Sequence, residues 1–431
     1  MKKNRTLLYG SLLDENVPPS TATSDAILRG KYNGNSIDIP LSHDVLSKHT
    51  LFVGGTGSGK STLFYHFVRQ LKAGMTANDV MLIFDSKGDF HSKFFDGSKD
   101  MLIGNSNQYR KQSERWNLYR EIIADGHDRT SVGLNTQEIC KALFADRVER
   151  NTSNAFFPNA ARDLLASLMI ALNRNAPYNN DELLEYIQKT PKDIRHELIV
   201  HPDLAAVANY IDDRGSPQTQ GVFSELFSVV REIFTGVFAS AGVFSIREFI
   251  RDKGGRALFI EYDLALGSVL APVYSLMFDL ALKEALGRQK SNGNVFLIAD
   301  ELKLMPNLQH LEDGINFGRS LGLKIMAGLQ SIGQLEAVYA KDAKAKNIIA
   351  GFGSLYAFRS PDPDTREYVS RQFGRNMLQE SFQSSDGKYT SETRQGCVVE
   401  DWDLTSLQVG EAIIGLPFDK PFRFQFDDYL D

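Results

Sequence analysis

Long hydrophobic runs are missing from this sequence of 431 residues. The longest apolar stretch, 222–245, is interrupted by Glu225, Arg231 and Glu232, so we expect no membrane-spanning helix. The first residues, Met-Lys-Lys-Asn-Arg, are followed by no hydrophobic segment, which is not the pattern of a secretion signal. We therefore expect a cytoplasmic protein.

Cysteine is also scarce, with Cys140 and Cys397 far apart in the chain. Two distant cysteines predict free thiols in a reducing compartment rather than a disulfide framework. Among the scattered histidines, His196 and His201 come closest to a pair, but no acidic or thiol cluster accompanies them. This spacing argues against a metal site built from protein side chains alone.

Positive charge is not in excess, since 48 Lys and Arg stand against 54 Asp and Glu. The net charge of -6 argues against a surface coated in positive potential, although a basic pore inside a ring would not alter that total. DNA binding is therefore neither favoured nor excluded by charge. The apolar content of 42% is that of a globular protein, and the length suffices for two cores.

Short apolar runs followed by glycine or acidic residues recur along the chain, as is typical of parallel strands buried on both faces. They lie at 50–53, 80–84, 257–260, 295–299, 325–329, 354–358 and 412–416, and shorter strands are expected at 26–28 and 36–41. From about 130 to 242 the apolar residues instead follow helical spacing, with stripes at 160–172 and 226–237 that we interpret as core packing. The pattern predicts an all-α domain inserted into one α/β domain.

A glycine-rich loop follows the predicted strand 50–53 and precedes a helical pattern at 63–71. It matches the phosphate-loop pattern G-x-x-x-x-G-K-[ST], in which backbone N–H groups wrap phosphates at a helix N-terminus. Lys60 would reach the β and γ phosphates of ATP, and the hydroxyl of Ser61 would join Mg²⁺. The predicted nucleotide-binding residues are Gly54, Gly55, Thr56, Gly57, Ser58, Gly59, Lys60, Ser61 and Thr62.

Two carboxylates, Asp300 and Glu301, end the predicted strand 295–299, where ligands lie in open α/β sheets. Asp300 would hold Mg²⁺ through water, and Glu301 would polarise the attacking water, which a hydrolase needs. Lys60 and Asp300 lie 240 positions apart, and the helical insertion accounts for that separation. Gln330, at the end of strand 325–329, is a candidate sensor of the γ phosphate.

Several motifs together resemble those of conjugative type IV secretion coupling ATPases of the TraD/TraG class, within the FtsK/HerA superfamily of DNA pumps. They are the phosphate loop, Asp300-Glu301, and the segment 317–323 running into Gly328-Leu329-Gln330-Ser331, with further similar pieces at 49–51, 85–89, 115–118 and 358–365. The resemblance covers nearly all of 26–420. It implies a RecA-like P-loop fold with a mainly parallel sheet, divided into a polar lead at 1–25, a nucleotide-binding domain at 26–130 and 243–431, and the all-α insertion at 131–242.

The resemblance also implies a homo-hexameric ring in which an arginine from the neighbouring subunit completes each ATP site. Arg319 stands at the matching position. Lys48 is a further basic interface candidate, Arg359 and Arg371 are weaker ones, and Lys87 and Lys93 are candidates for contacts with a DNA backbone.

We therefore expect an ATP-driven translocase that uses Mg²⁺ and moves single- or double-stranded DNA without sequence specificity, with protein effectors as a second kind of cargo. Relatives usually carry membrane-spanning helices ahead of the motor, so we expect a missing or separate anchor at the cytoplasmic face of the inner membrane. A relaxase and secretion-system ATPases are further expected partners. The alternatives are an ATP-dependent assembly switch that does not translocate, and a DNA pump unrelated to secretion.

Overall fold

The structure is a computed structural model that describes residues 4–13, 23–150, 154–175, 178–265, 267–287, 293–339, 342–383 and 389–429. The chain forms two compact units. The first contains 1–76, 296–303 and 315–431, and the second contains 77–295 and 304–314. Helix α12, Leu311–Phe317, includes the boundary between them.

The main sheet of the first unit combines parallel and antiparallel pairs, with the strand order β3-β2-β14-β13-β10-β4-β9-β8. Strands β10, β4 and β9 run parallel, which places Val53 opposite both Ala357 and Leu329. The pairs from β10 through β13, β14 and β2 to β3 are antiparallel. These strands are β2 Ala26–Tyr32, β3 Asn35–Leu41, β4 Thr50–Val53, β8 Val295–Ala299, β9 Leu323–Leu329, β10 Ser354–Phe358, β13 Glu411–Gly415 and β14 Phe422–Phe426.

Helices of the first unit follow most of the parallel strands. The apolar face of α2 is buried through Leu63, Phe64, Phe67, Val68 and Leu71, which explains why this segment folds back onto the sheet. The helices are α1 His43–Ser47, α2 Lys60–Gly74, η4 Leu302–Leu304, η5 Gly318–Leu321, α13 Ile332–Val338, α14 Asp342–Ala350, α15 Pro363–Gln372 and α16 Asp401–Thr405.

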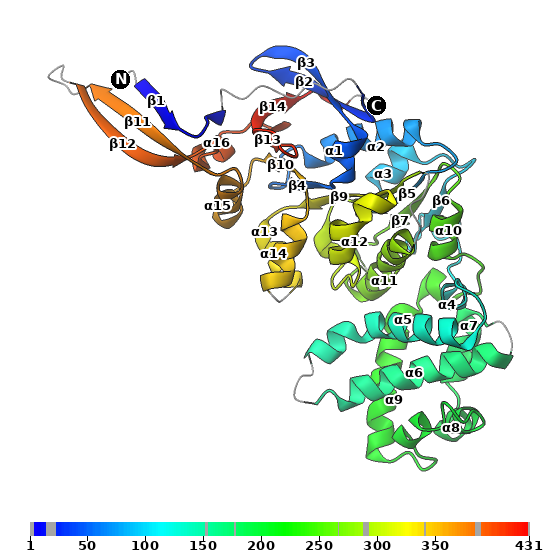
Figure 1. Ribbon diagram of the computed structural model, residues 1–431. Coiled ribbons are helices and arrows are strands. Elements are labelled where there is room, and N and C mark those ends of the chain that lie inside the picture. The colour runs from blue at the N-terminus through cyan, green and yellow to red at the C-terminus, as the bar shows by residue number, and fades with distance from the viewer. Residues whose placement is uncertain are drawn as a thin grey trace. The chain divides into compact units, whose positions relative to one another are not determined.

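A separate sheet of three antiparallel strands, in the order β1-β11-β12, places the first strand of the chain beside two strands that come late in the sequence (Figure 1). Strand β1, Asn4–Tyr9, pairs with β11, Arg375–Gln383, which pairs with β12, Tyr389–Cys397. The sequence did not predict β1, because its partner lies about 370 residues away. The rest of the predicted polar lead, 1–3 and 14–22, lies outside the described residues.

The second unit contains parallel strands in the order β5-β7-β6 and a group of helices. Its strands are β5 Val80–Asp85, β6 Met101–Ile103 and β7 Arg256–Glu261. Its helices are α3 Asp89–Phe94, α4 Leu118–Ile122, α5 Arg129–Arg150, α6 Phe156–Asn175, α7 Asn180–Ile187, α8 Pro191–Ile199, η2 Val207–Tyr210, α9 Pro217–Ile233, η3 Gly236–Ala239, α10 Ile246–Asp252 and α11 Gly267–Leu286.

Helices α5, α6 and α9 pack together through the two predicted apolar stripes, whose residues are buried (Figure 1). The segments that enter and leave this helical region run side by side, since Asn117 N donates to Phe244 O at 2.9 Å and Phe244 N donates to Arg115 O at 3.0 Å. This pairing supports an insertion near 131–242, and those bounds stay a prediction. No helix in the described ranges is long and apolar enough to cross a membrane.

The predicted fold class is confirmed, because the central strands are mainly parallel and a helical region lies between β6 and β7 in the chain. The antiparallel strands β13, β14, β2 and β3 extend the sheet beyond the parallel core.

Candidate nucleotide site

The phosphate loop connects β4 to α2, as its sequence predicted. Gly59 immediately precedes α2 with φ at 103°, in the left-handed region that glycine tolerates best. A Cβ there would lie 2.7 Å from the backbone nitrogen of Gly410, so the loop can approach this neighbour only with glycine. Lys60, Ser61 and Thr62 form the first turn of α2, whose N–H groups have no partner within the helix.

Backbone hydrogen bonds hold the loop against two other segments. Gly55 N donates to Arg359 O at 2.8 Å, and Gly410 N donates to Ser58 O at 3.0 Å. A Cβ at Gly54 would lie 2.6 Å from Cβ of Phe358, so the loop also packs tightly against the end of β10. Contacts with the end of β10 and with Gly410 therefore hold the loop in one conformation.

The polar atoms of the loop fit a bound polyphosphate. Lys60 Nζ donates to the carbonyl oxygen of Gly54 and, at 3.2 Å, to that of Gly55, so its ammonium lies over the loop. The hydroxyl oxygen of Ser58 is buried and has no hydrogen-bond partner among the described residues. A lysine, an unsatisfied hydroxyl and a helix N-terminus converge here, which is the chemistry that phosphate oxygens require.

The carboxylates after β8 lie beside the end of β9, as the strand order requires. Gly328 permits this approach, because a Cβ there would lie 2.1 Å from the carbonyl oxygen of Asp300. Glu301 Oε2 accepts a hydrogen bond of 2.7 Å from Gln330 Nε2. Its other oxygen, Oε1, is buried and lies 3.9 Å from Lys303 Nζ, too far for a hydrogen bond.

A pocket of about 630 Å³ opens over the phosphate loop. Gly55, Thr56, Gly57 and Ser58 form one wall, and Gln330 contributes to another. The structure thus brings together the loop, Gln330 and, through its hydrogen bond to Gln330, Glu301. Its volume suits a ligand of nucleotide size.

Arg319 does not line this pocket. It lies in η5 with its side chain half exposed, and its Nη2 is 2.5 Å from Oδ1 of Asp44. The other oxygen of Asp44 accepts from Lys48 Nζ at 2.7 Å. The hydrogen bonds from Lys48 and then Arg319 lower the pKa of Asp44. The two predicted interface cations therefore share one carboxylate on the surface.

Part of the pocket wall comes from residues to which the sequence had assigned no contact with the nucleotide of their own chain. These residues are Ser331, Gln334, Arg359, 360–362 and Arg366, together with Thr405, Gln408 and Val409 from the turn 405–409. Asp362 caps α15, accepting from Thr365 N at 3.0 Å, and the Asp-Pro pair was a local signal for that helix start. No local pattern indicates the turn 405–409, because it reaches the loop only through tertiary packing.

The other arginines and lysines predicted from the sequence lie elsewhere. Arg371 pairs with Glu367 on the exposed face of α15 and does not line the pocket. Lys87 and Lys93 are exposed in the second unit, which leaves their predicted DNA contacts untested.

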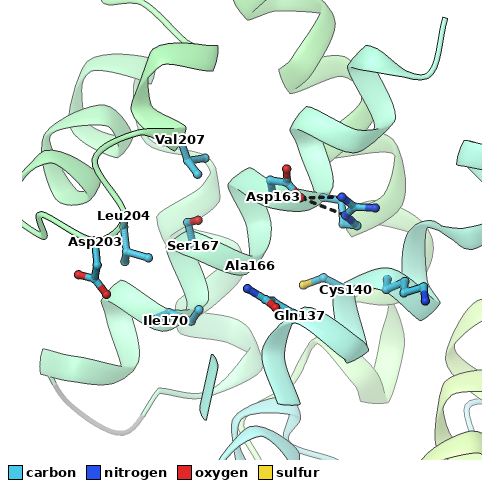
Figure 2. A pocket seen from close by; sticks show the side chains of 11 residues that line it. Gln137, Cys140, Asp163, Ala166, Ser167, Ile170, Asp203, Leu204 and Val207 are labelled. Atoms are coloured by element: carbon cyan, nitrogen blue, oxygen red, sulfur yellow. Dashed lines mark hydrogen bonds and ion pairs between the residues drawn. The ribbon is translucent and has the colours of Figure 1, made fainter. Parts of the chain in front are cut away.

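A second cavity of about 510 Å³ lies among α5, α6 and the segment that leads to η2 (Figure 2). Its charges are largely paired, since Arg162 Nη2 is 2.9 Å from Asp163 and Asp203 is 2.5 Å from Arg174 Nη2. Burial raises the pKa of the Cys140 thiol in its wall to about 12, which disfavours thiolate chemistry. With no phosphate loop, this cavity is the weaker candidate for a nucleotide.

Comparisons with known proteins identify the family of this chain. Residues 35–406 match the family described as type IV secretion-system coupling protein DNA-binding domain. The coupling protein TraD of Escherichia coli (strain K12) is 24% identical over 371 residues, which are 81% of this chain and 47% of TraD. The chain thus spans about half the length of this curated relative.

Solved structures share the fold over most of the chain. The bacterial conjugative coupling protein TrwBdeltaN70, in an unbound form, is 25% identical with a TM-score of 0.74, covering 93% of this chain and 89% of that one. The plasmid coupling protein TrwB in complex with ADP and Mg²⁺ is 23% identical with a TM-score of 0.72, covering 95% and 90%.

Proposed function

This chain belongs to the family of type IV secretion-system coupling proteins, and from that premise we propose that it is an ATP-hydrolysing motor that moves DNA in conjugative transfer. The observation that carries the proposal is the hydrogen bond between Glu301 and Gln330 beside a well-formed phosphate loop. A protein that only binds nucleotide has little need of a carboxylate held in one orientation next to the phosphate loop.

The residues of the site divide the work of hydrolysis among them. Backbone N–H groups of 54–62 and the Lys60 ammonium bind the phosphates of ATP. Ser61 and Asp300 would hold Mg²⁺, which would neutralise phosphate charge when bound. Glu301 accepts a proton from the attacking water, and Gln330 orients Glu301 or contacts the γ phosphate. The complex of TrwB with ADP and Mg²⁺ supports this choice of ligand and metal ion.

We propose further that the active form is a homo-hexameric ring with ATP between subunits. Arg319 lies outside the pocket of its own chain and is half exposed, which suits a residue that completes the pocket of a neighbour. Asp44 would release Arg319 to the neighbour's phosphates, because an exposed ion pair contributes only about 0–1 kcal/mol.

DNA is the proposed cargo, held through its phosphate backbone without regard to sequence. The description of the matching family as a DNA-binding domain supports this choice. We place the motor at the cytoplasmic face of the inner membrane through a further anchor, with a relaxase and secretion-system ATPases as partners.

The test is ATP hydrolysis measured at low salt with and without single- and double-stranded DNA of several lengths. The proposal expects stimulation by DNA and loss of hydrolysis in Lys60→Ala and in Arg319→Ala. Mixing the two variants should restore activity, because a subunit with an intact loop then meets a neighbour with an intact Arg319. ATP hydrolysis that no DNA stimulates would favour the assembly switch, and no recovery at any mixing ratio would remove Arg319 from the site.

A further inference from the structure

Two arginines line the nucleotide pocket, and they differ in what their guanidinium groups contact. Arg366 Nε lies 2.6 Å from Oδ1 of Asp401, and its Nη1 donates to the carbonyl oxygens of Ser360 at 3.1 Å and Pro361 at 2.8 Å. Its side chain is only 15% exposed. Arg366 therefore holds residues 360–361 of the pocket wall in place.

Arg359, in contrast, is exposed, and its side chain makes no hydrogen bond or ion pair within the described part of the chain. Its backbone is well anchored, since Arg359 O accepts from Gly55 N at 2.8 Å. The register of β10 against β4 explains this contact: Ala357 lies opposite Val53, and two residues later Arg359 meets Gly55. The backbone of Arg359 is thus fixed beside the phosphate loop, while its guanidinium is available to bind a ligand.

We infer that Arg359 binds the phosphate groups of the nucleotide held by the loop of its own subunit. The inference rests on the proposed function and adds a second cation to the site in cis. Among the described residues that line the pocket, only Arg359 and Arg366 carry a positive charge, and Arg366 is committed to Asp401 and two carbonyl groups. A guanidinium can donate two parallel hydrogen bonds to a phosphate, which gives it both affinity and geometry.

This role differs from a role at the subunit interface, for which the sequence made Arg359 and Arg371 two of the weaker candidates. The structure separates the two residues. Arg359 lines the pocket of its own chain, whereas Arg371 pairs with Glu367 one helical turn away on α15. Arg371 is thus a matched control, an exposed arginine 12 positions further along that contacts no part of the pocket.

The first experiment measures equilibrium binding of ATP to the full chain. Arg359→Ala should weaken ATP binding by roughly 10- to 100-fold, the range of a hydrogen bond to a charged group. Arg359→Lys should recover part of the loss, because the charge remains but the paired donors do not. Arg371→Ala should bind as the wild type does. Unchanged affinity in Arg359→Ala, in a protein with a wild-type melting temperature, would overturn the inference.

The second experiment decides between cis and trans by mixing variants. At an ATP concentration too low to saturate Arg359→Ala, mixing this variant with Lys60→Ala should not raise hydrolysis above that of Arg359→Ala alone, because every loop in such a ring lacks either its lysine or its own Arg359. Arg319→Ala mixed with Lys60→Ala is the positive control. Recovery in the Arg359 mixture would show that Arg359 acts across the interface and refute the cis assignment. A wild-type chain that does not bind ATP would refute the proposed function itself, and this inference with it.

Discussion

Gln330→Ala should lower the rate of ATP hydrolysis by roughly 10- to 100-fold while leaving ATP binding close to that of the wild type. The reason is the hydrogen bond of 2.7 Å from Gln330 Nε2 to Oε2 of Glu301. A hydrogen bond to a charged group contributes about 1.5–3 kcal/mol, and each 1.36 kcal/mol lost from transition-state stabilisation slows a reaction about tenfold. Without this bond, the carboxylate of Glu301 is no longer held in one orientation.

Glu301→Gln should lower the rate further, on the order of 10²- to 10⁴-fold, because it removes the proposed general base itself. The combined variant decides how Gln330 works. If Gln330 acts only by orienting Glu301, then adding Gln330→Ala to Glu301→Gln should cause little further loss. Losses that multiply would refute this reasoning and assign Gln330 a direct contact with the γ phosphate instead.

The assay is steady-state release of phosphate at saturating ATP and DNA, with ATP affinity measured separately for each variant. Lys303→Met is the control within the same cluster. Lys303 Nζ lies 3.9 Å from Oε1 of Glu301, and its side chain is 32% exposed. Removing its charge should change the rate by no more than about fivefold, which corresponds to the energy of about 0–1 kcal/mol of such pairs. A loss as large as that of Gln330→Ala would mean that charge, rather than orientation, is what Glu301 needs.

Three further predictions concern the metal ion and stability. Ser61→Ala should raise the Mg²⁺ concentration needed for half-maximal hydrolysis by about tenfold or more, and an unchanged Mg²⁺ titration would remove Ser61 from the metal site. His310→Gln should lower the free energy of unfolding by roughly 3 kcal/mol at pH 6. Burial alone would lower the pKa of His310. The hydrogen bonds of its ring to Asp279 and Glu138 outweigh burial and raise this pKa from 6.5 to about 9. This stabilisation is complete below pH 6.5 and is lost as pH rises through 9. Denaturant unfolding of the wild type and of His310→Gln should therefore show a smaller difference in free energy of unfolding at pH 10 than at pH 6. An equal difference at both pH values would contradict the prediction. Phe418→Gly should raise the free energy of unfolding by about 0.5–1 kcal/mol in thermal melts. Phe418 is 96% exposed, and its φ of 68° lies in the left-handed region, which strains any residue except glycine. A lower stability of the variant would show that the ring of Phe418 stabilises the fold by more than the backbone strain costs.

Much of the fold could be predicted because its signals are local. The longer buried parallel strands are continuous apolar runs, so β4, β5, β7, β8, β9 and β10 were located to within two residues, whereas the short parallel strand β6 was not predicted. Strands β1, β11 and β12 were not predicted, since they are partly exposed and gain their stability from one another. Alternation on an exposed sheet is a weaker pattern than a buried run.

The candidate site also has a part that the sequence predicts and a part that it does not. A phosphate loop is a contiguous motif in which a few glycines and a lysine serve one local conformation, so residues 54–62 alone predict where phosphates would bind. Which side chains face those phosphates could not be read from the sequence, because that depends on strand order and register. The order β10-β4-β9-β8 brings Arg359 to Gly55, and Gln330 to Glu301, which lies 29 positions earlier in the chain.

The sequence by itself therefore determined the chemistry of this protein: a phosphate loop, two carboxylates after a buried strand and an inserted helical region. Only the tertiary structure decided which residues act together. It joined Glu301 to Gln330, placed Arg359 on the wall of its own pocket, and left Arg319 outside that pocket beside Asp44. The physical reason is that local sequence encodes conformation over a few residues, whereas contacts between distant residues are set by the packing of whole strands and helices.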